Sequence, residues 1–159
     1  MKISHAYLTL LLFVVTSCSI VHQIPTKPPI DLDPSYLNRQ IRLLIVKEFG
    51  PLRTNTDVAI LLQYYTTNRI VFPSDYNLRI FIEQEGKWVE IAEKPAIRPK
   101  DPIVLSPDNP SSYGHIVGFW PQYPDPNKTY YLRVYVFGDM TTPDGIKKVA
   151  AFVDFVVTP

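Results

Sequence analysis

Two stretches near the C-terminus alternate between apolar side chains and other residues. The first runs from Thr129 to Phe137 and the second from Val149 to Val157. Every second residue of a strand lies on the same face, so each stretch has one face suited to a core. The inward positions are Tyr130, Leu132, Val134, Val136, Val149, Ala151, Val153, Phe155 and Val157. Because Gly138 and Asp139 give a turn signal after the first stretch, the pattern predicts an antiparallel hairpin at the centre of a sheet.

Shorter apolar runs upstream predict the other strands. Val58–Tyr65 is apolar on both faces, which is typical of an internal strand. Tyr76–Gln84 alternates, and Glu85-Gly86 then signals a tight turn into a returning strand at Lys87–Ile91. Further strands are expected at Ile41–Phe49, Ile103–Leu105 and Tyr113–Trp120. About seven short strands at this spacing indicate an antiparallel β-sandwich, with the proline-rich segment Ala92–Pro110 crossing between its sheets.

The composition agrees with an all-β fold. Sixteen prolines stand against six glycines, and no long window of helix-forming residues is present. Acidic and basic residues nearly balance, with a formal net charge of +1, which argues against a nucleic-acid partner. The chain has one cysteine, so no disulfide can form within it and packing must hold the domain together.

The N-terminal residues have the pattern of a secretory signal. Lys2 precedes an apolar run from Ala6 to Val15, which is about half the length that a membrane-spanning helix needs. The following Val15-Thr16-Ser17-Cys18 resembles a bacterial lipobox, which implies a signal peptide at residues 1–17 and acylation of Cys18. Two or three acyl chains would anchor the protein stably in a membrane. The alternatives are an ordinary secretory signal with an incidental cysteine, or a buried thiol.

The division of the chain follows from this signal. Residues 18–39 contain four prolines and few large apolar residues, as expected of a semi-rigid tether from the acylated cysteine. Residues 40–159 are expected to form one β-sandwich. The expected location is the bacterial cell envelope, with Ser19 implying delivery to the outer membrane where the cell has one.

Two segments resemble an immunoglobulin-like fold. Pro126 to Val134 is similar to the approach to strand F of that fold, which implies that Tyr130 is its corner tyrosine and that Leu132 takes the place of the cysteine. The segment from Val58 to the Gly86-Lys87-Trp88 hairpin is similar to bacterial immunoglobulin-like domains of the proteinase-inhibitor type. The resemblance covers roughly Val58 to Val157 and implies an immunoglobulin-like sandwich.

The sequence offers little catalytic chemistry. His115 could pair with Ser111 or Ser112 and with Asp108 as a hydrolase, but the spacing matches no nucleophile motif, and a histidine facing water at a strand edge is expected instead. Metal ligands are too few for a zinc site, and no loop has calcium-binding or phosphate-binding spacing. A protein without enzymatic activity, metal or cofactor is therefore expected.

Aromatic side chains are the remaining candidates for a binding surface. Trp88, Trp120 and Tyr123 are expected to pack first and to bind second. The favoured interpretation is a lipid-anchored module that binds or assembles with an envelope protein. One alternative is a protease-inhibitor-like domain that inserts residues 138–145 or 98–109 into a protease. The other is a carbohydrate-binding module that uses Trp120 or Tyr123.

Overall fold

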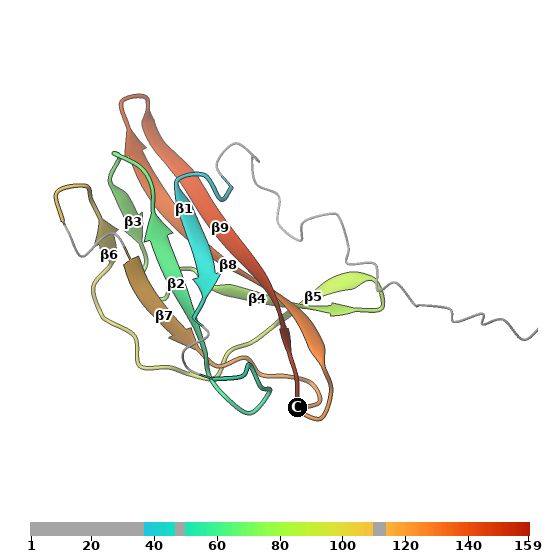
Figure 1. The fold of residues 1–159 in the computed structure, drawn as a ribbon. Helices are drawn as coiled ribbons and strands as arrows, with labels where there is room; N and C mark the ends of the chain where they lie inside the picture. The colour runs from blue at the N-terminus through green and yellow to red at the C-terminus, as the bar shows by residue number, and fades with distance from the viewer. Residues whose placement is uncertain (1–36, 47–49, 110–113) are drawn as a thin grey trace, which may run out of the picture.

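A computed structural model describes residues 37–46, 50–109 and 114–159 of the chain. These residues form nine strands and no helix (Figure 1). The strands are β1 (Ile41–Ile45), β2 (Val58–Tyr64), β3 (Ile70–Phe72), β4 (Arg79–Gln84), β5 (Lys87–Ile91), β6 (Ile103–Leu105), β7 (Gly114–Phe119), β8 (Tyr130–Thr142) and β9 (Gly145–Val157).

The strands form two antiparallel sheets that pack face to face. The six-stranded sheet, here called sheet A, has the order β5-β4-β8-β3-β6, and β9 pairs with β8. The three-stranded sheet, here called sheet B, has the order β1-β2-β7 and lies across β8 and β9 (Figure 1). The predicted all-β sandwich is confirmed, with nine strands in place of about seven. The prediction that Val58–Tyr65 forms an internal strand is also confirmed, because β2 lies between β1 and β7.

The long hairpin of β8 and β9 differs from its prediction in length. Thirteen residue pairs join the two strands, from Tyr130–Val157 to Thr142–Gly145. The expected turn at Gly138-Asp139 was therefore wrong. A Cβ atom on Gly138 would lie 2.9 Å from a ring carbon of Phe72, so this glycine allows β3 to pack closely and does not end the strand. Within sheet A, β8 is central and β9 lies at an edge.

Strands β3 and β4 lie in succession along the same edge of β8. Ile70 pairs with Met140, and Ile80 pairs with Val134. The predicted strand Tyr76–Gln84 begins only at Arg79, because Tyr76 and Asn77 have φ angles of 59° and 45°. These left-handed residues separate the two short strands, although the Phe137 N–H still donates to the Tyr76 carbonyl at 3.0 Å.

The hairpin of β4 and β5 matches its prediction. Glu85 and Gly86 have φ angles of 52° and 76°, as a two-residue turn of type I′ requires. The Gly86 N–H donates to the Glu83 carboxylate at 2.6 Å, which ties the turn to the strand.

The chain then runs from β5 to β6, which both lie on the side of β8 that β3 and β4 occupy. Between them, Glu93 bridges Pro121, just beyond β7 of sheet B. The segment at residues 92–110 thus meets sheet B near its start, returns to sheet A at the predicted short strand β6, and leads on to β7 of sheet B.

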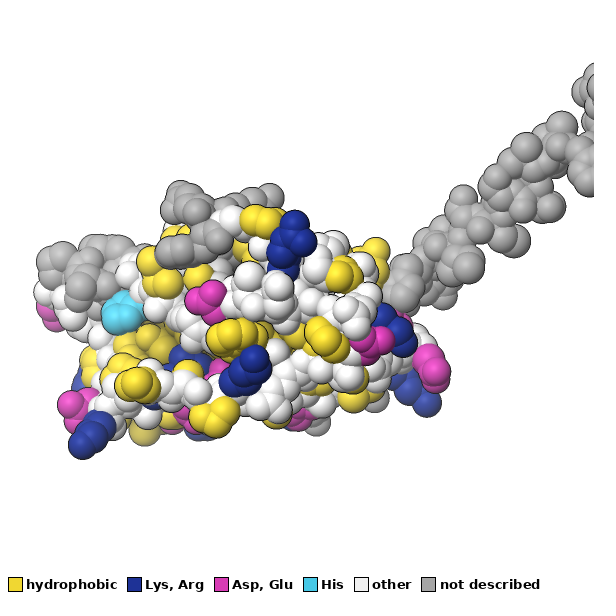
Figure 2. Space-filling view, turned by 90° about the horizontal axis from the view of Figure 1, so that it is seen from below, with side chains coloured by type: hydrophobic (Ala, Val, Ile, Leu, Met, Phe, Trp, Pro, Cys, Tyr) yellow, Lys and Arg dark blue, Asp and Glu magenta, His cyan; other side chains and the backbone are white. Residues whose placement is uncertain are grey.

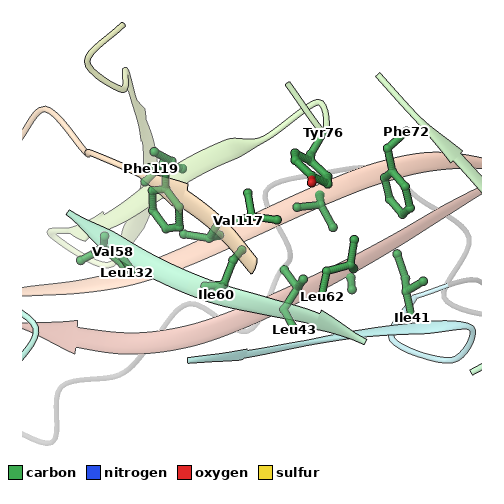
Figure 3. Close-up of a cluster of buried hydrophobic side chains, with 14 of the residues drawn as sticks. Ile41, Leu43, Val58, Ile60, Leu62, Phe72, Tyr76, Val117, Phe119 and Leu132 are labelled. Carbon is green, nitrogen blue, oxygen red and sulfur yellow. The ribbon is translucent and has the colours of Figure 1, made fainter. Parts of the chain in front are cut away.

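The core lies between the inner faces of the two sheets. Figure 3 shows Leu43, Ile60 and Leu62 of sheet B among the same cluster as Leu132 and Phe72 of sheet A. All five are buried, and at about 25 cal/mol per Å² this burial is the main stabilising contribution in a chain without disulfides. Alternation in β1, β2 and β8 therefore places the predicted residues inward.

Two single bridges lie along β9, one near its middle and one just beyond its C-terminal end. Leu37 bridges Ala150 in parallel, and the Asn38 N–H donates to the Ala150 carbonyl at 3.0 Å. Beyond the end of the strand, Arg53 bridges Thr158 in parallel. The ordered fold thus already includes residues 37–39, which the sequence places in the tether.

Candidate functional site

The outer face of sheet A is covered by its own side chains. Cross-strand pairing places Phe81 opposite Arg133, and Tyr135 opposite both Arg79 and Phe152. The Tyr135 ring packs edge-on against Phe81 at a centroid distance of 5.9 Å and against Phe152 at 5.4 Å. Although Tyr135 points away from the core, its exposed fraction is only 1%. The aromatic rings therefore form a second, thin apolar layer.

Two arginines cover this layer. The Arg133 guanidinium lies 4.7 Å from the Trp88 ring centroid and 4.4 Å from that of Phe152, and it donates two hydrogen bonds to Asp154 at 2.7 and 2.6 Å. Burial lowers the pKa of Arg133, but the bonds and charge of Asp154 outweigh it, so that the net shift is upward. The hydrogen bonds to Asp154 and the contacts with the Trp88 and Phe152 rings together fix the Arg133 guanidinium over the aromatic layer.

The other charges of this face are also paired. Arg79 donates two hydrogen bonds to Glu90, which lowers the pKa of Glu90 and raises that of Arg79. Lys148 lies 2.6 Å from Asp139. Both pairs are largely exposed, so each adds little stability. Together they leave the outer face of sheet A with few unpaired charges for a ligand.

The outer face of sheet B has a different composition. Its centre is a row of three aliphatic side chains, Leu44, Leu61 and Ile116, placed directly opposite one another on β1, β2 and β7. Leu44 is 45% exposed and Ile116 is 60% exposed. The three strands contain one residue that is charged at neutral pH, Arg42. This face is therefore an aliphatic surface open to solvent.

An aromatic ring with a cation above it lies toward each end of this face. Tyr65, 54% exposed, follows β2, and the Arg42 guanidinium lies 5.3 Å from its ring centroid. Trp120, 38% exposed, follows β7, and the Lys94 ammonium lies 3.7 Å from its ring centroid. Within the described part of the chain, Arg42 and Lys94 have no ion-pair partner. Asp57, just before β2, is an exposed carboxylate at the Trp120 end.

Tyr123 and Tyr130 stack on each other away from both faces, with ring centroids 5.3 Å apart. The Tyr130 hydroxyl donates to the Asp125 carbonyl and accepts from the Asp125 N–H, both at 3.0 Å, which is the arrangement of a tyrosine corner. The Tyr123 hydroxyl is buried without a hydrogen-bond partner among the described residues, and burial raises its pKa. Tyr123 therefore packs at the boundary of the core, and Tyr130 covers one face of its ring.

Trp88 lines a small cavity on sheet A. This cavity has a volume of about 210 Å³, and its outward-pointing walls are Trp88, Tyr131, Asp154 and Val156. Trp88 is half-buried, because one side of its ring is covered by Arg133. Of the three predicted binding residues, Trp120 and Trp88 thus lie on opposite faces of the sandwich. The apolar row of sheet B was missed, although Leu44, Leu61 and Ile116 were visible as outward positions in the alternation.

His115 lies at the edge of sheet B, as predicted, but it does not simply face water. It pairs with Leu62, so its side chain belongs to the inner face of β7 and is half-buried. Figure 2 shows one face of the molecule, on which hydrophobic side chains are interspersed with basic and acidic ones. Among the described residues, no hydrogen bond or ion pair joins His115 to Asp108, and Ser111 and Ser112 lie outside them.

The loops considered for protease inhibition are shorter or more constrained than expected. Strand pairing continues to Thr142 and resumes at Gly145, so only Pro143 and Asp144 remain as a turn. In the other segment, Arg98 binds the Glu93 carboxylate at 2.8 and 2.9 Å and donates to the Gly118 carbonyl at 3.1 Å. These contacts tie the start of that segment to β7.

Several predictions fall on residues that the structure does not describe. These are the signal peptide at residues 1–17, the acylation site Cys18 and the tether up to residue 36. In the residues that are described, no group of three or more histidine, cysteine, aspartate or glutamate side chains is placed to hold a metal ion. The same residues include no helix of the length and hydropathy needed to span a membrane.

Comparison with known proteins gives no family. No protein-family model matches the chain, and no curated protein matches it. A crystal structure of a protein from Archaeoglobus fulgidus is similar over 75% of this chain and 94% of that one, with 12% sequence identity and a TM-score of 0.33. A similarity at this level supports no conclusion about fold or function.

Proposed function

We propose that this chain is a lipid-anchored protein of the bacterial cell envelope, and that its β-sandwich is a non-catalytic binding module. The outer face of sheet B is the proposed binding surface. The anchor is supported by the sequence alone, because the single cysteine, Cys18, ends the apolar run of a signal peptide. An immunoglobulin-like role in envelope assembly is consistent with the resemblance of Val58–Val157.

One observation carries the choice of surface. Eight large apolar side chains are exposed among the described residues, and Leu44, Tyr65, Ile116 and Trp120 belong to this one face. Scattered exposed apolar residues are normal, but a contiguous group marks an interaction site. Among the exposed large apolar residues of sheet A are only Val89 on β5 and Ile146 and Val156 at opposite ends of β9, which form no contiguous group.

A photo-crosslinking amino acid at position 116 tests the surface in living cells. Irradiation is expected to give a discrete adduct from position 116 and none from position 156, which is the matched exposed position on the outer face of sheet A. Equal labelling at both positions, or no adduct at either, would contradict the assignment of sheet B.

Acylation is tested separately by labelling cells with radioactive palmitate. The wild-type chain is expected to incorporate label, and Cys18→Ala is expected to lose it. A wild-type chain without label would refute the anchor and leave the binding surface to the crosslinking result.

A second candidate function is carbohydrate binding at the cavity that Trp88 lines. Sugars stack on aromatic rings and hydrogen-bond to carboxylates, and Trp88, Tyr131 and Asp154 are the walls of that cavity. Affinity electrophoresis in gels that contain soluble cell-wall polysaccharide tests it. Tyr131→Ala should lose any retardation, and Tyr65→Ala, on the other sheet, should keep it. Migration that no polysaccharide changes would exclude this candidate.

A further inference from the structure

We infer that the outer face of sheet B rests on the surface of the membrane that anchors the chain, with the aliphatic row at the boundary between headgroups and acyl chains. The inference rests on the proposed function for the presence of a tether, and it names the occupant of the proposed binding surface. The occupant is an anionic lipid surface.

The composition of the face matches that of an interfacial surface. Aliphatic side chains form its centre, and an aromatic ring lies toward each end, as in proteins that insert shallowly into a bilayer. Arg42 and Lys94 lie over these rings, so their apolar stems can remain with the aromatic groups while the charges reach lipid phosphates. These seven side chains would thus contact both the apolar and the charged layers of the membrane surface.

The charges of the face are complementary to anionic headgroups. Arg42 and Lys94 lie toward opposite ends of β2, about 20 Å apart if six residues of strand separate their rows. A continuous negative surface satisfies both cations at once, whereas a protein partner would need two separate acidic sites at that spacing. Asp57 is the one opposing charge within the described outward positions, and it lies at the Trp120 end near Lys94.

The tether permits this contact. Eighteen residues lie between Cys18 and Leu37, and the nineteen steps along the chain span at most about 65 Å in any conformation. A domain confined within that distance of a bilayer meets it at high effective concentration, so that a weak surface contact is populated. The outer face of sheet A is less suited, because its arginines are already paired with Glu90 and Asp154.

Fluorescence of Trp120 in the full acylated chain tests the inference. Trp88→Phe leaves Trp120 as the only tryptophan, and the chain is reconstituted into phosphatidylcholine vesicles with phosphatidylglycerol and brominated acyl chains. At least twofold quenching of Trp120 is expected. Ile116→Asp in the same background is expected to abolish the quenching, and Val156→Asp, on sheet A, is expected to preserve it.

Flotation of the same samples separates the possible failures. A chain that floats with the vesicles but shows no quenching, or equal quenching in the Ile116→Asp and Val156→Asp variants, overturns the inference and leaves the anchor. A chain that does not float with the vesicles overturns both the membrane contact of sheet B and the lipid anchor. A protein adduct from position 116 in cells, with no quenching in vesicles, overturns the lipid surface and retains the binding module.

A second readout covers the case in which Trp88→Phe does not fold. Ile116→Cys and Val156→Cys, each labelled with an environment-sensitive fluorophore, retain both tryptophans. A blue shift on adding vesicles is expected at position 116 and not at position 156. The reverse pattern, or no shift at either position, overturns the inference.

Discussion

The outer faces of the two sheets use the same kinds of side chain in different ways. On sheet A, Arg133 lies over the rings of Trp88 and Phe152 and binds Asp154, so the aromatic layer is sealed. On sheet B, Arg42 lies over the single ring of Tyr65 at one end of the face and leaves the aliphatic row open. An arginine therefore stabilises the fold where it is enclosed and paired, and remains available to a partner where it is not.

The largest difference is expected from removing each arginine. Arg133→Ala removes a two-bond ion pair and uncovers two rings, so the free energy of unfolding should fall by about 2–3 kcal/mol. Arg42→Ala should change it by less than about 0.5 kcal/mol. Urea unfolding measures both variants, and similar losses from the two would contradict the distinction between a sealed and an open face.

A second pair extends the comparison to the stacked tyrosines at the end of the sandwich. Tyr130→Phe removes both hydrogen bonds to the Asp125 backbone and is expected to cost about 1–2 kcal/mol. Tyr123→Phe removes a buried hydroxyl that has no hydrogen-bond partner among the described residues, so stability at neutral pH should stay equal or rise. Thermal unfolding distinguishes the two, and a larger loss from Tyr123→Phe would show that its hydroxyl is satisfied.

Alkaline pH should destabilise the sealed outer face of sheet A through its buried phenol, Tyr135. Burial is the largest cause that raises the pKa of Tyr135, so the folded state keeps its proton longer than the unfolded state does. Its contribution to stability is complete below pH ~10 and is lost as the pH rises further, by at most about 1.4 kcal/mol per pH unit.

A phenylalanine variant measures that contribution. Tyr135→Phe should make the loss of stability above pH ~10 less steep. Urea unfolding at several pH values provides the curves. Parallel curves for wild type and Tyr135→Phe would show that this phenol does not contribute.

The smallest effect is expected at the centre of the open face. Ile116→Thr keeps a β-branched side chain on an exposed strand position and should change stability by less than about 0.5 kcal/mol. Solubility of the unanchored chain should increase, because the apolar row is interrupted. A loss of several kcal/mol would indicate that the face is buried in the folded protein.

The alternation of residues was sufficient to predict the sandwich, since the inward sides of β2 and β8 follow it directly. The prediction was wrong at positions where contacts with a neighbouring strand determine the backbone conformation or the size of the residue. Gly138 supplies room for Phe72 rather than a turn, and Tyr76 and Asn77 adopt left-handed angles that no apolar pattern indicates. Such choices depend on a neighbouring strand and are not encoded in the local sequence.

The candidate surface was harder to predict than the fold. A strand that is apolar on both sides, such as β2, is normally covered on both, so the sequence indicates burial rather than an open face. Only the two-layer arrangement shows that the outward side of β2 has no third layer among the described residues. The aromatic candidates were misleading because their rings are covered within the fold. Tyr123 stacks on Tyr130, and Arg133 lies over the ring of Trp88.

The bridge between Leu37 and Ala150 also determines how a force applied to the N-terminal side of the domain is transmitted to the sandwich. The Asn38 side chain accepts from the Phe152 N–H at 2.8 Å, and its own N–H donates to the Ala150 carbonyl. Because Leu37 runs parallel to β9, a load along the strand stretches these bonds together rather than opening them one by one. Mechanical force therefore reaches the longest strand pair of the sandwich first, before it can unravel β1.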